Sequence, residues 1–290
     1  MSGANEQIRK RMKAQVLLQS KTGSRLAFCI VHWNAPDFLL LNVNQIELLY
    51  PNSKIYIFDN SSEQVHLASI KAGLEKFTNV TLFNLVGIPK WAKKLHLDML
   101  FEWQSHSAGL QFLLNYAAKQ SDEIAVFLDQ DCILSTRVDD LFSKFSEDVI
   151  LIGARDRWRG HASANLIHPS FMILQPNRIF RLFGNSCLYD ERTKLLPAHA
   201  QDPYHGISLK ALGKMLYLEP QIHTTIPLLT SYGRNGVIFA WHAWYSSRTV
   251  GMNSGALEGY PVSWLRNVRK LEYDFMMQIH KDTADELQNL

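Results

Sequence analysis

Four strand-like apolar stretches recur within the first 130 residues, and segments with apolar residues at helical spacing separate them. The stretches are Leu26–Val31, Lys54–Phe58, Val80–Leu85 and Ile124–Leu128. Short apolar runs of this kind are typical of strands that are buried on both faces. A strand, a helix and a second such strand form a parallel pair with a crossover connection. The pattern therefore predicts a doubly wound α/β fold, with a mostly parallel central sheet flanked by helices.

The second half of the chain is less regular, but neither an internal repeat nor a low-complexity linker divides it from the first. We therefore predict one domain over residues 25–260, with halves at 25–134 and 135–260, preceded by a polar tail or helix over 1–24 and followed by a helix over 261–290. Predicted elements of the second half include strands at Val149–Gly153, Phe171–Leu174 and Met215–Leu218, a helix at Asp202–Leu212 and a loop at Gly233–Gly236.

Composition excludes several classes of protein. With 47% apolar and 20% charged residues among 290, the chain is not intrinsically disordered. Its net charge of +3 is too small and too scattered for a nucleic-acid binder. Three isolated cysteines, Cys29, Cys132 and Cys187, argue against a disulfide framework or a structural zinc site and are read as buried free thiols.

The sequence contains neither an apolar run long enough for a transmembrane helix nor a signal peptide, so a cytoplasmic location is expected. Residues 1–24 are polar and basic. A solvated tail is the favoured reading, and peripheral contact with an anionic membrane surface is the alternative.

The most informative motif is Asp129-Gln130-Asp131, which directly follows the strand-like run ending at Leu128. In open α/β sheets, ligands bind at the carboxyl ends of the strands. Carboxylate oxygens at that edge are suitable ligands for Mg²⁺ or Mn²⁺, which also bind diphosphate oxygens. The motif therefore predicts a metal site, while a solvated polar loop is the alternative.

Three further places carry candidate residues. Asp59 and Asn60 follow the second strand and suit a base or ribose, although a simple turn is the alternative. Asp202 suits a general base, or only the cap of the helix it begins. His242 lies between Trp241 and Trp244, and Arg248 follows this stretch. The two residues suit a metal and a phosphate, although a packed core histidine is the alternative for His242.

Taken in order, these motifs resemble the GT-A glycosyltransferases, especially the large inverting group called family 2. The likeness spans roughly residues 25 to 248. The matching features are a first strand ending near Asn34, the D-N-x-S turn at Asp59–Ser62, the L-D-x-D sequence at Leu128–Asp131, Gln201-Asp202 before a helix ending at Gly213, a strand ending at Pro220, and His242 before Arg248. The resemblance implies a GT-A fold with a Rossmann-like nucleotide-binding half and an acceptor-binding half.

The resemblance also implies a role for each matching residue. Asp131 would bind Mn²⁺ or Mg²⁺, His242 would complete the metal site, and Asp129 would lie by the ribose or a metal-bound water. The remaining residues would act on the donor and acceptor: Asn34, Asp59 and Asn60 beside the nucleoside, Arg248 at the diphosphate, and Asp202 as the base that activates the acceptor for attack with inversion.

The predicted function is therefore metal-dependent transfer of a sugar from a nucleoside diphosphate sugar, with UDP favoured, to an unidentified acceptor. That acceptor is a glycan, a lipid-linked molecule, a peptide or a small molecule. Arg155, His168 and the basic aromatic segment at 157–159 are candidates for gripping an acidic one, with a solvated loop as the alternative.

One departure from the family pattern bears on the catalytic base, because Gln201 stands where an acid is usual before Asp202. Glu219 is the fallback base. A non-catalytic relative that binds a nucleotide-sugar or carbohydrate therefore stays open as an alternative. A nucleotidyltransferase is the other alternative, although the chain lacks a Gly-rich loop after the first strand.

Overall fold

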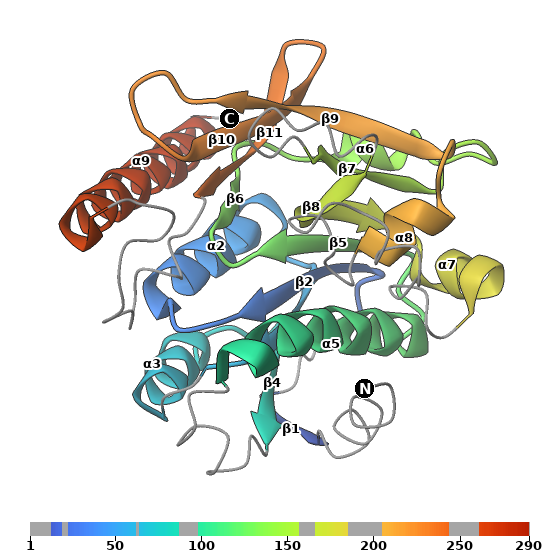
Figure 1. Cartoon of the computed structure of the whole chain (residues 1–290), viewed down its shortest axis with the longest axis horizontal. Coiled ribbons are helices and arrows are strands. Elements are labelled where there is room, and N and C mark those ends of the chain that lie inside the picture. The colour runs from blue at the N-terminus through green and yellow to red at the C-terminus, as the bar shows by residue number, and fades with distance from the viewer. Residues whose placement is uncertain are drawn as a thin grey trace.

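The computed structural model describes residues 23–61, 64–86, 98–156, 166–184, 205–243 and 261–289, together with the backbone of 13–18. Figure 1 shows a central sheet with helices on both sides. The strands are β1 (Lys13–Leu18), β2 (Leu26–His32), β3 (Lys54–Asp59), β4 (Val80–Val86), β5 (Ile124–Asp129), β6 (Cys132–Leu134), β7 (Leu151–Arg155), β8 (Ile167–Leu174), β9 (Met215–Ile222), β10 (Leu229–Arg234) and β11 (Val237–Ala243). The helices are α2 (Pro36–Leu49), α3 (Gln64–Leu74), α5 (Asp98–Lys119), α6 (Asp139–Phe142), α7 (Pro176–Phe183), α8 (His205–Lys210) and α9 (Val262–Gln288).

The sheet is mixed, and the prediction of a mostly parallel sheet is wrong. Its strand order is β1-β4-β3-β2-β5-β8-β7-β9-β10-β11-β6. Four neighbouring pairs are parallel: β2 with β3 and β5, β3 with β4, and β7 with β9. The remaining six pairs are antiparallel. The α/β pattern of the first half is confirmed, whereas the second half adds hairpin-type pairs that side-chain periodicity does not reveal.

Strand direction determines which strand ends share one edge of the sheet. β8 runs antiparallel to β5, and β7 runs antiparallel to β8, so β7 points the same way as β5. β9 is parallel to β7. The carboxyl ends of β2, β3, β5, β7 and β9 therefore lie at one edge of the sheet, together with the beginning of β8. This is the edge at which α/β proteins bind their ligands.

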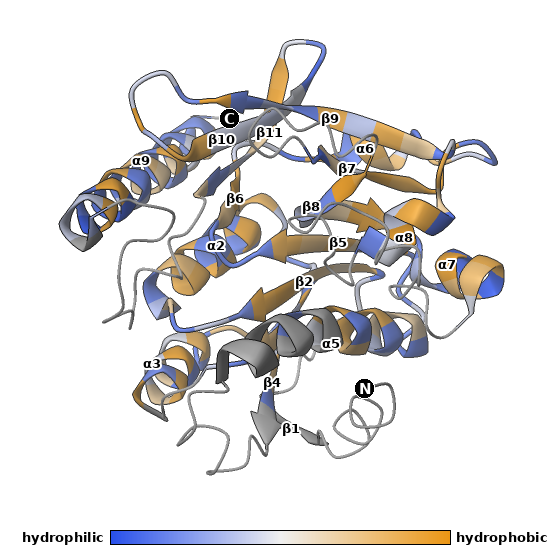
Figure 2. Ribbon diagram, viewed as in Figure 1, coloured by the Kyte–Doolittle hydropathy of each residue, from blue (hydrophilic) through white to orange (hydrophobic). Residues whose placement is uncertain are grey.

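Alternating side chains of the central strands pack against two layers of helices. Phe28 and Ile30 belong to one apolar cluster with residues of α2 and α3. Ala27 and Cys29 belong to a second cluster with residues of α5, α7 and α8. This period-of-two alternation makes both faces of the strands apolar. It explains why the central strands are almost continuously hydrophobic in sequence, as their colouring in Figure 2 shows.

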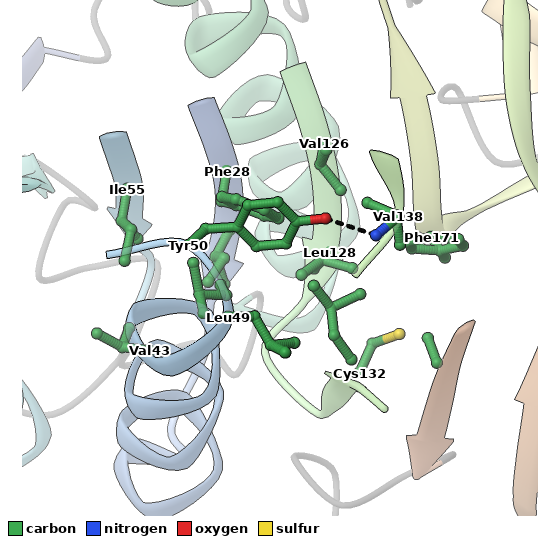
Figure 3. Close-up of a cluster of buried hydrophobic side chains, with 14 of the residues drawn as sticks. Phe28, Val43, Leu49, Tyr50, Ile55, Val126, Leu128, Cys132, Val138 and Phe171 are labelled. Carbon is green, nitrogen blue, oxygen red and sulfur yellow. Dashed lines mark hydrogen bonds between the residues drawn. The ribbon is translucent and has the colours of Figure 1, made fainter. Parts of the chain in front are cut away.

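One end of the first cluster is fixed by Tyr50, the residue that follows α2 (Figure 3). Its ring packs against Phe28, with ring centroids 5.1 Å apart. Its hydroxyl accepts a hydrogen bond from the Val138 amide and donates one to Asp139 Oδ2 at 3.1 Å. Burial is the main cause that raises the pKa of Tyr50, so the phenol stays protonated and can donate. The end of α2 is thereby joined to the segment that follows β6.

The sheet curls so that its last strand returns to its middle. β6 begins at Cys132, soon after β5 ends at Asp129, yet β6 pairs with β11 at the far end of the strand order. A third apolar cluster lies at this closure and contains Phe38 of α2, Ile133 of β6 and Met276 of α9. The closure places β11 next to the end of β5.

Several predicted boundaries differ from the structure. Lys13–Leu18 form strand β1, which pairs with β4, instead of a tail or a helix. β9 continues past Pro220 to Ile222, and Pro220 lies opposite Tyr232 of β10. Gly233 belongs to β10, so the predicted loop at 233–236 is the turn of a hairpin. Among the described residues, no helix is both long and apolar enough to cross a membrane.

Gly153 of β7 is required by the close approach of β8. A Cβ atom at this position would lie 2.4 Å from the carbonyl oxygen of Phe171, which belongs to the backbone and cannot move independently. We expect Gly153→Ala to lower the free energy of unfolding by about 1–3 kcal/mol, because the two strands must separate. Urea denaturation measures this change. Gly23→Ala is the control, since a Cβ atom at that position would meet no other group within 4 Å, and equal stability of both variants would contradict the prediction.

Candidate metal and nucleotide site

Asp129, Asp131 and His242 lie together where β5 ends. One potential ligand atom from each residue falls within 4.8 Å of the others. His242 Nε2 is 3.4 Å from Asp131 Oδ1 and 3.6 Å from Asp129 Oδ2. Within the described part of the chain, this is the one group of three or more Asp, Glu, His or Cys side chains that could hold a metal ion. The structure thus brings together the three residues that the sequence proposes as a metal site.

The backbone explains why two residues at the β5–β6 connection meet one from β11. His242 pairs with Cys132 in the β6–β11 ladder, and the Ala243 amide donates a hydrogen bond to the Asp131 carbonyl at 2.9 Å. The side chains of Asp131 and His242 are only 7% and 4% exposed, whereas Asp129 is 19% exposed. Asp129 thus forms the open side of the cluster.

Gln130, between the two acids, holds the turn in place. Its amide oxygen accepts a hydrogen bond from the Trp33 amide at 2.6 Å, and its amide nitrogen donates to the Trp33 carbonyl at 3.0 Å. Asn42 of α2 donates to the Asp129 carbonyl at 3.2 Å. The middle residue of the Asp-x-Asp sequence therefore fixes the carboxylates relative to the end of β2, and the two acids are left facing the site.

Asp59 is buried in a hydrogen-bond network at the end of β3. Its Oδ1 lies 2.8 Å from His32 Nδ1 and accepts from the Ser61 hydroxyl at 2.6 Å, while Asn84 reaches Oδ2 at 3.4 Å. The Ala35 amide donates to His32 Nε2 at 3.0 Å, so the His32 proton is on Nδ1 and points at Asp59. Asp59 is 1% exposed and shapes the turn that borders the site.

Asn34 and Asn60 belong to the loops after β2 and β3. Asn34 has a left-handed backbone with φ of 51°, a conformation that asparagine tolerates better than most residues. The Asn60 amide donates to the His32 carbonyl at 2.8 Å, which ties the two loops together. Both side chains are nearly buried, at 4% and 5% exposure. The loops predicted to flank a nucleoside are therefore adjacent to each other and to the turn at Gln130.

Four residues that the sequence did not single out as ligands or bases also lie near the acidic pair. His106 Nε2 of α5 is 3.7 Å from Asp129 Oδ1. Tyr232 and Ser170 connect His242 to His168 through hydrogen bonds. None of them stands in a recognisable motif, since a single Tyr in β10 or Ser in β8 carries no local signal. Strand pairing brings them to this place.

Glu272 of α9 is the most unusual acid near the site. It is 1% exposed, and its Oε1 has no hydrogen-bond partner among the described residues. Burial, and then the negative charge of Asp131, raise its pKa to about 9, while Arg269 opposes the shift. Glu272 is therefore a neutral acid at pH 7.

Cys132, next to Asp131, is a free and buried thiol. Burial, followed by the charges of Asp129 and Asp131, raises its pKa well above the usual range. A protonated thiol is a poor metal ligand, so the chemistry of the cluster is that of oxygen and imidazole ligands. Cys29 is also free and buried, as expected, whereas Cys187 lies outside the described residues.

The remaining candidates have mixed outcomes. Asp202, Gln201, Arg248 and residues 157–159 lie outside the described residues. Glu219 forms an ion pair with Arg155 at 3.3 Å, and that Arg155 also stacks over Tyr217 at 4.4 Å. His205 is buried, and its Nε2 lies 3.2 Å from Asp156 Oδ2.

No protein-family model matches the chain, and no curated protein matches it. Solved structures of glycosyltransferases do show similarity. The galactosyltransferase LgtC, in complex with donor and acceptor sugar analogs, is 12% identical with a TM-score of 0.45, over 84% of this chain and 95% of LgtC. The mannosyltransferase PcManGT from Pyrobaculum calidifontis, in complex with GDP-Man and Mn²⁺, is 12% identical with a TM-score of 0.41, over 97% of this chain and 82% of that one.

The glycosyltransferase GlyE of Streptococcus pneumoniae TIGR4 is 12% identical with a TM-score of 0.44, over 67% of this chain and 45% of GlyE. At such identities and TM-scores, these neighbours do not fix a function.

Glu272 yields a prediction about stability and pH. Its folded-state pKa of about 9 lies above the ordinary 4.5, so the folded chain keeps a proton that the unfolded chain releases between these values. Stability contributed by this proton is complete below pH 4.5 and is lost as the pH rises toward 9. Because Gln is neutral at every pH, Glu272→Gln should become progressively more stable than the wild type from about pH 5 to about pH 9.

Urea denaturation at several pH values, in the presence of a chelator, measures this difference. Glu286→Gln, at an exposed position of the same helix, is the control and should show no such trend. Parallel pH profiles for Glu272→Gln and the wild type would contradict the prediction, even if the amide itself changed stability by a constant amount.

Proposed function

We propose that this chain is a metal-dependent glycosyltransferase that uses a nucleoside diphosphate sugar. The observation that carries the proposal is the cluster of Asp129, Asp131 and His242 at the carboxyl edge of the sheet, beside the loops after β2 and β3. Two carboxylates and an imidazole, all within 4.8 Å, form a set that fits a divalent cation. The adjoining loops would hold a nucleoside next to the metal.

The donor set favours Mn²⁺ over Mg²⁺, because an imidazole nitrogen suits a transition metal better than it suits Mg²⁺. When bound, the cation would supply Lewis-acid stabilisation of the charge that grows on the departing diphosphate. Asp131 and His242 would hold it from the buried side, and the more exposed Asp129 would face the donor. His106, at 3.7 Å from Asp129, would orient that carboxylate.

UDP is the favoured nucleotide, and the acceptor is not specified by any described residue. By the resemblance noted for the sequence, Asp202 would take the proton from the acceptor hydroxyl and transfer would proceed with inversion. Asn34, Asp59 and Asn60 would border the nucleoside, although the buried Asp59 would act mainly through the turn it holds. Arg248 would neutralise the diphosphate.

A panel of nucleotide-sugars with Mn²⁺ or Mg²⁺, read by release of nucleoside diphosphate, tests the proposal. Slow hydrolysis of the donor gives a signal without any acceptor. We expect release from one donor with Mn²⁺, and a loss of at least about 100-fold in Asp131→Asn, which removes a charge needed by the cation. Asp140→Asn, at an exposed carboxylate of α6, is the control and should keep full activity.

The outcomes separate the alternatives. Metal-dependent binding of a nucleotide-sugar without release, unchanged in Asp202→Asn, would identify a non-catalytic binding protein. Release of pyrophosphate from a nucleoside triphosphate would identify a nucleotidyltransferase. If no nucleotide-sugar bound with any metal, the proposed donor site would be wrong.

The stereochemical prediction has its own test. During donor hydrolysis, ¹H NMR taken before mutarotation shows the anomer that is first released. We expect the anomer opposite to that of the donor, formed more slowly by Asp202→Asn because the variant lacks the base. First release of the same anomer as the donor would show retention and would remove the assigned role of Asp202, while leaving the transferase activity itself intact.

A further inference from the structure

A row of hydrogen-bonded side chains leads from the metal cluster into the interior of the curled sheet. His242 Nδ1 lies 3.0 Å from the Tyr232 hydroxyl, which lies 3.0 Å from Ser170 Oγ, which lies 2.8 Å from His168 Nδ1. His242, Tyr232 and Ser170 are 3%, 1% and 0% exposed. The row joins β11 and β10 to β8, although β8 pairs with neither of them.

The direction of hydrogen-bond donation along the row is fixed at its far end, at His168. The backbone amide of Ser170 donates a hydrogen bond to His168 Nδ1 at 3.2 Å, so this nitrogen is an acceptor and carries no proton. His168 Nδ1 is therefore the final acceptor of the row.

The protons of the row can then be assigned one by one. The Ser170 hydroxyl has a single proton, which goes to His168 Nδ1. Ser170 Oγ must then accept from the Tyr232 hydroxyl, which lies 3.0 Å away. With its one proton used, the Tyr232 oxygen accepts from His242 Nδ1.

We propose that Tyr232, Ser170 and His168 are positioning residues that hold His242 as the Nδ1–H tautomer, so that the lone pair of Nε2 faces Asp129 and Asp131. The Nε2 lone pair then faces Asp131 Oδ1 at 3.4 Å and Asp129 Oδ2 at 3.6 Å, and this arrangement is unfavourable by itself. It becomes favourable when a cation lies between the imidazole and the two carboxylates. The Nδ1–H tautomer of His242 is inferred from the hydrogen-bond geometry alone. Its role in holding a metal ion rests on the proposed function.

The polar character of the row supports a dedicated role. Buried hydroxyls at Tyr232 and Ser170 stabilise the fold only when they are hydrogen-bonded, and Phe and Ala would fill nearly the same space without that requirement. Histidine ligands of metals commonly donate their second ring N–H to an oxygen acceptor, which sets the tautomer and raises the basicity of the ligating nitrogen. Here the acceptor is a phenol that a third and a fourth residue hold in the accepting orientation.

The first experiment is direct observation of the tautomer in the metal-free full-length chain. Long-range ¹H–¹⁵N correlation spectra with ¹⁵N-labelled histidine distinguish protonated from unprotonated ring nitrogens, and His242→Gln assigns the signals. At mildly alkaline pH we expect His242 with a protonated Nδ1 and an unprotonated Nε2. A protonated Nε2 in the wild type would overturn the proposal, whatever the activity of the chain.

Two variants sharpen the test. In Ser170→Ala, the Tyr232 hydroxyl loses its acceptor and can turn to donate to His242 Nδ1, so we expect a switch to the Nε2–H tautomer. In Tyr232→Phe, the Nδ1 proton loses its acceptor and a mixture of tautomers is expected. A merely structural role for these residues would leave the tautomer unchanged.

Mn²⁺ affinity, measured by isothermal titration calorimetry without any donor, gives the second readout. We expect both variants to bind Mn²⁺ about 10-fold more weakly than the wild type. Tyr56→Phe is the matched control, because it also removes a buried hydroxyl, one that donates to Asp122 at 2.9 Å, and should leave Mn²⁺ affinity unchanged. Equal affinity in Tyr232→Phe, Ser170→Ala and the wild type would contradict the positioning role.

The two proposals fail in different ways. If the wild-type tautomer is as expected but no sugar is transferred, the positioning role stands and the transferase assignment is at fault. If the wild type binds no Mn²⁺ while the tautomer is as expected, the geometry of the row is right and the metal is wrong. If a variant does not fold, the wild-type spectrum still decides the assignment of the protons.

Discussion

The short connection between β5 and β6 is the constraint on which the rest of the site depends. Only Gln130 and Asp131 separate the two strands, yet β5 lies in the middle of the strand order and β6 lies at its end. The sheet must therefore curl until its last strand returns beside its middle. The hydrogen bonds of Gln130 to Trp33 and of the Ala243 amide to Asp131 hold the two sides of this closure. Both carboxylates lie at the joint.

The closure also explains how a site with its polar groups enclosed can form in an otherwise apolar sheet. Tyr232 and His242 come from the paired strands β10 and β11, whereas Ser170 comes from β8, which pairs with neither and meets them across the curled sheet. Enclosure strengthens each electrostatic interaction, since water no longer screens it. Burial also keeps Glu272 protonated and Cys132 in the thiol form.

The sequence predicts the first half of the fold well and the second half poorly, for a physical reason. Buried parallel strands such as β2 and β5 appear as apolar runs that end in polar turns, and Asp129 and Asp131 follow from the same signal. Strands such as β6 and β10 are short, and their partners are set by contacts between residues distant in sequence. The mixed order of the sheet is therefore not visible in any local pattern. His242 is found through its place in a series of motifs, whereas Tyr232 and Ser170 become visible only when strands β8, β10 and β11 are placed in space.

The pairing of β6 with β11 also affects how the chain folds. Cys132 of β6 pairs with His242 of β11, so β6 has no partner strand until most of the polypeptide has been made. Long-range pairing of this kind slows folding, because the intervening chain must be ordered first. During synthesis, the apolar residues of β6 therefore stay without their native partner strand, and exposed apolar segments of this kind favour misfolding. The turn between β5 and β6 is present early in the nascent chain, but His242 joins Asp129 and Asp131 only when the last strand arrives.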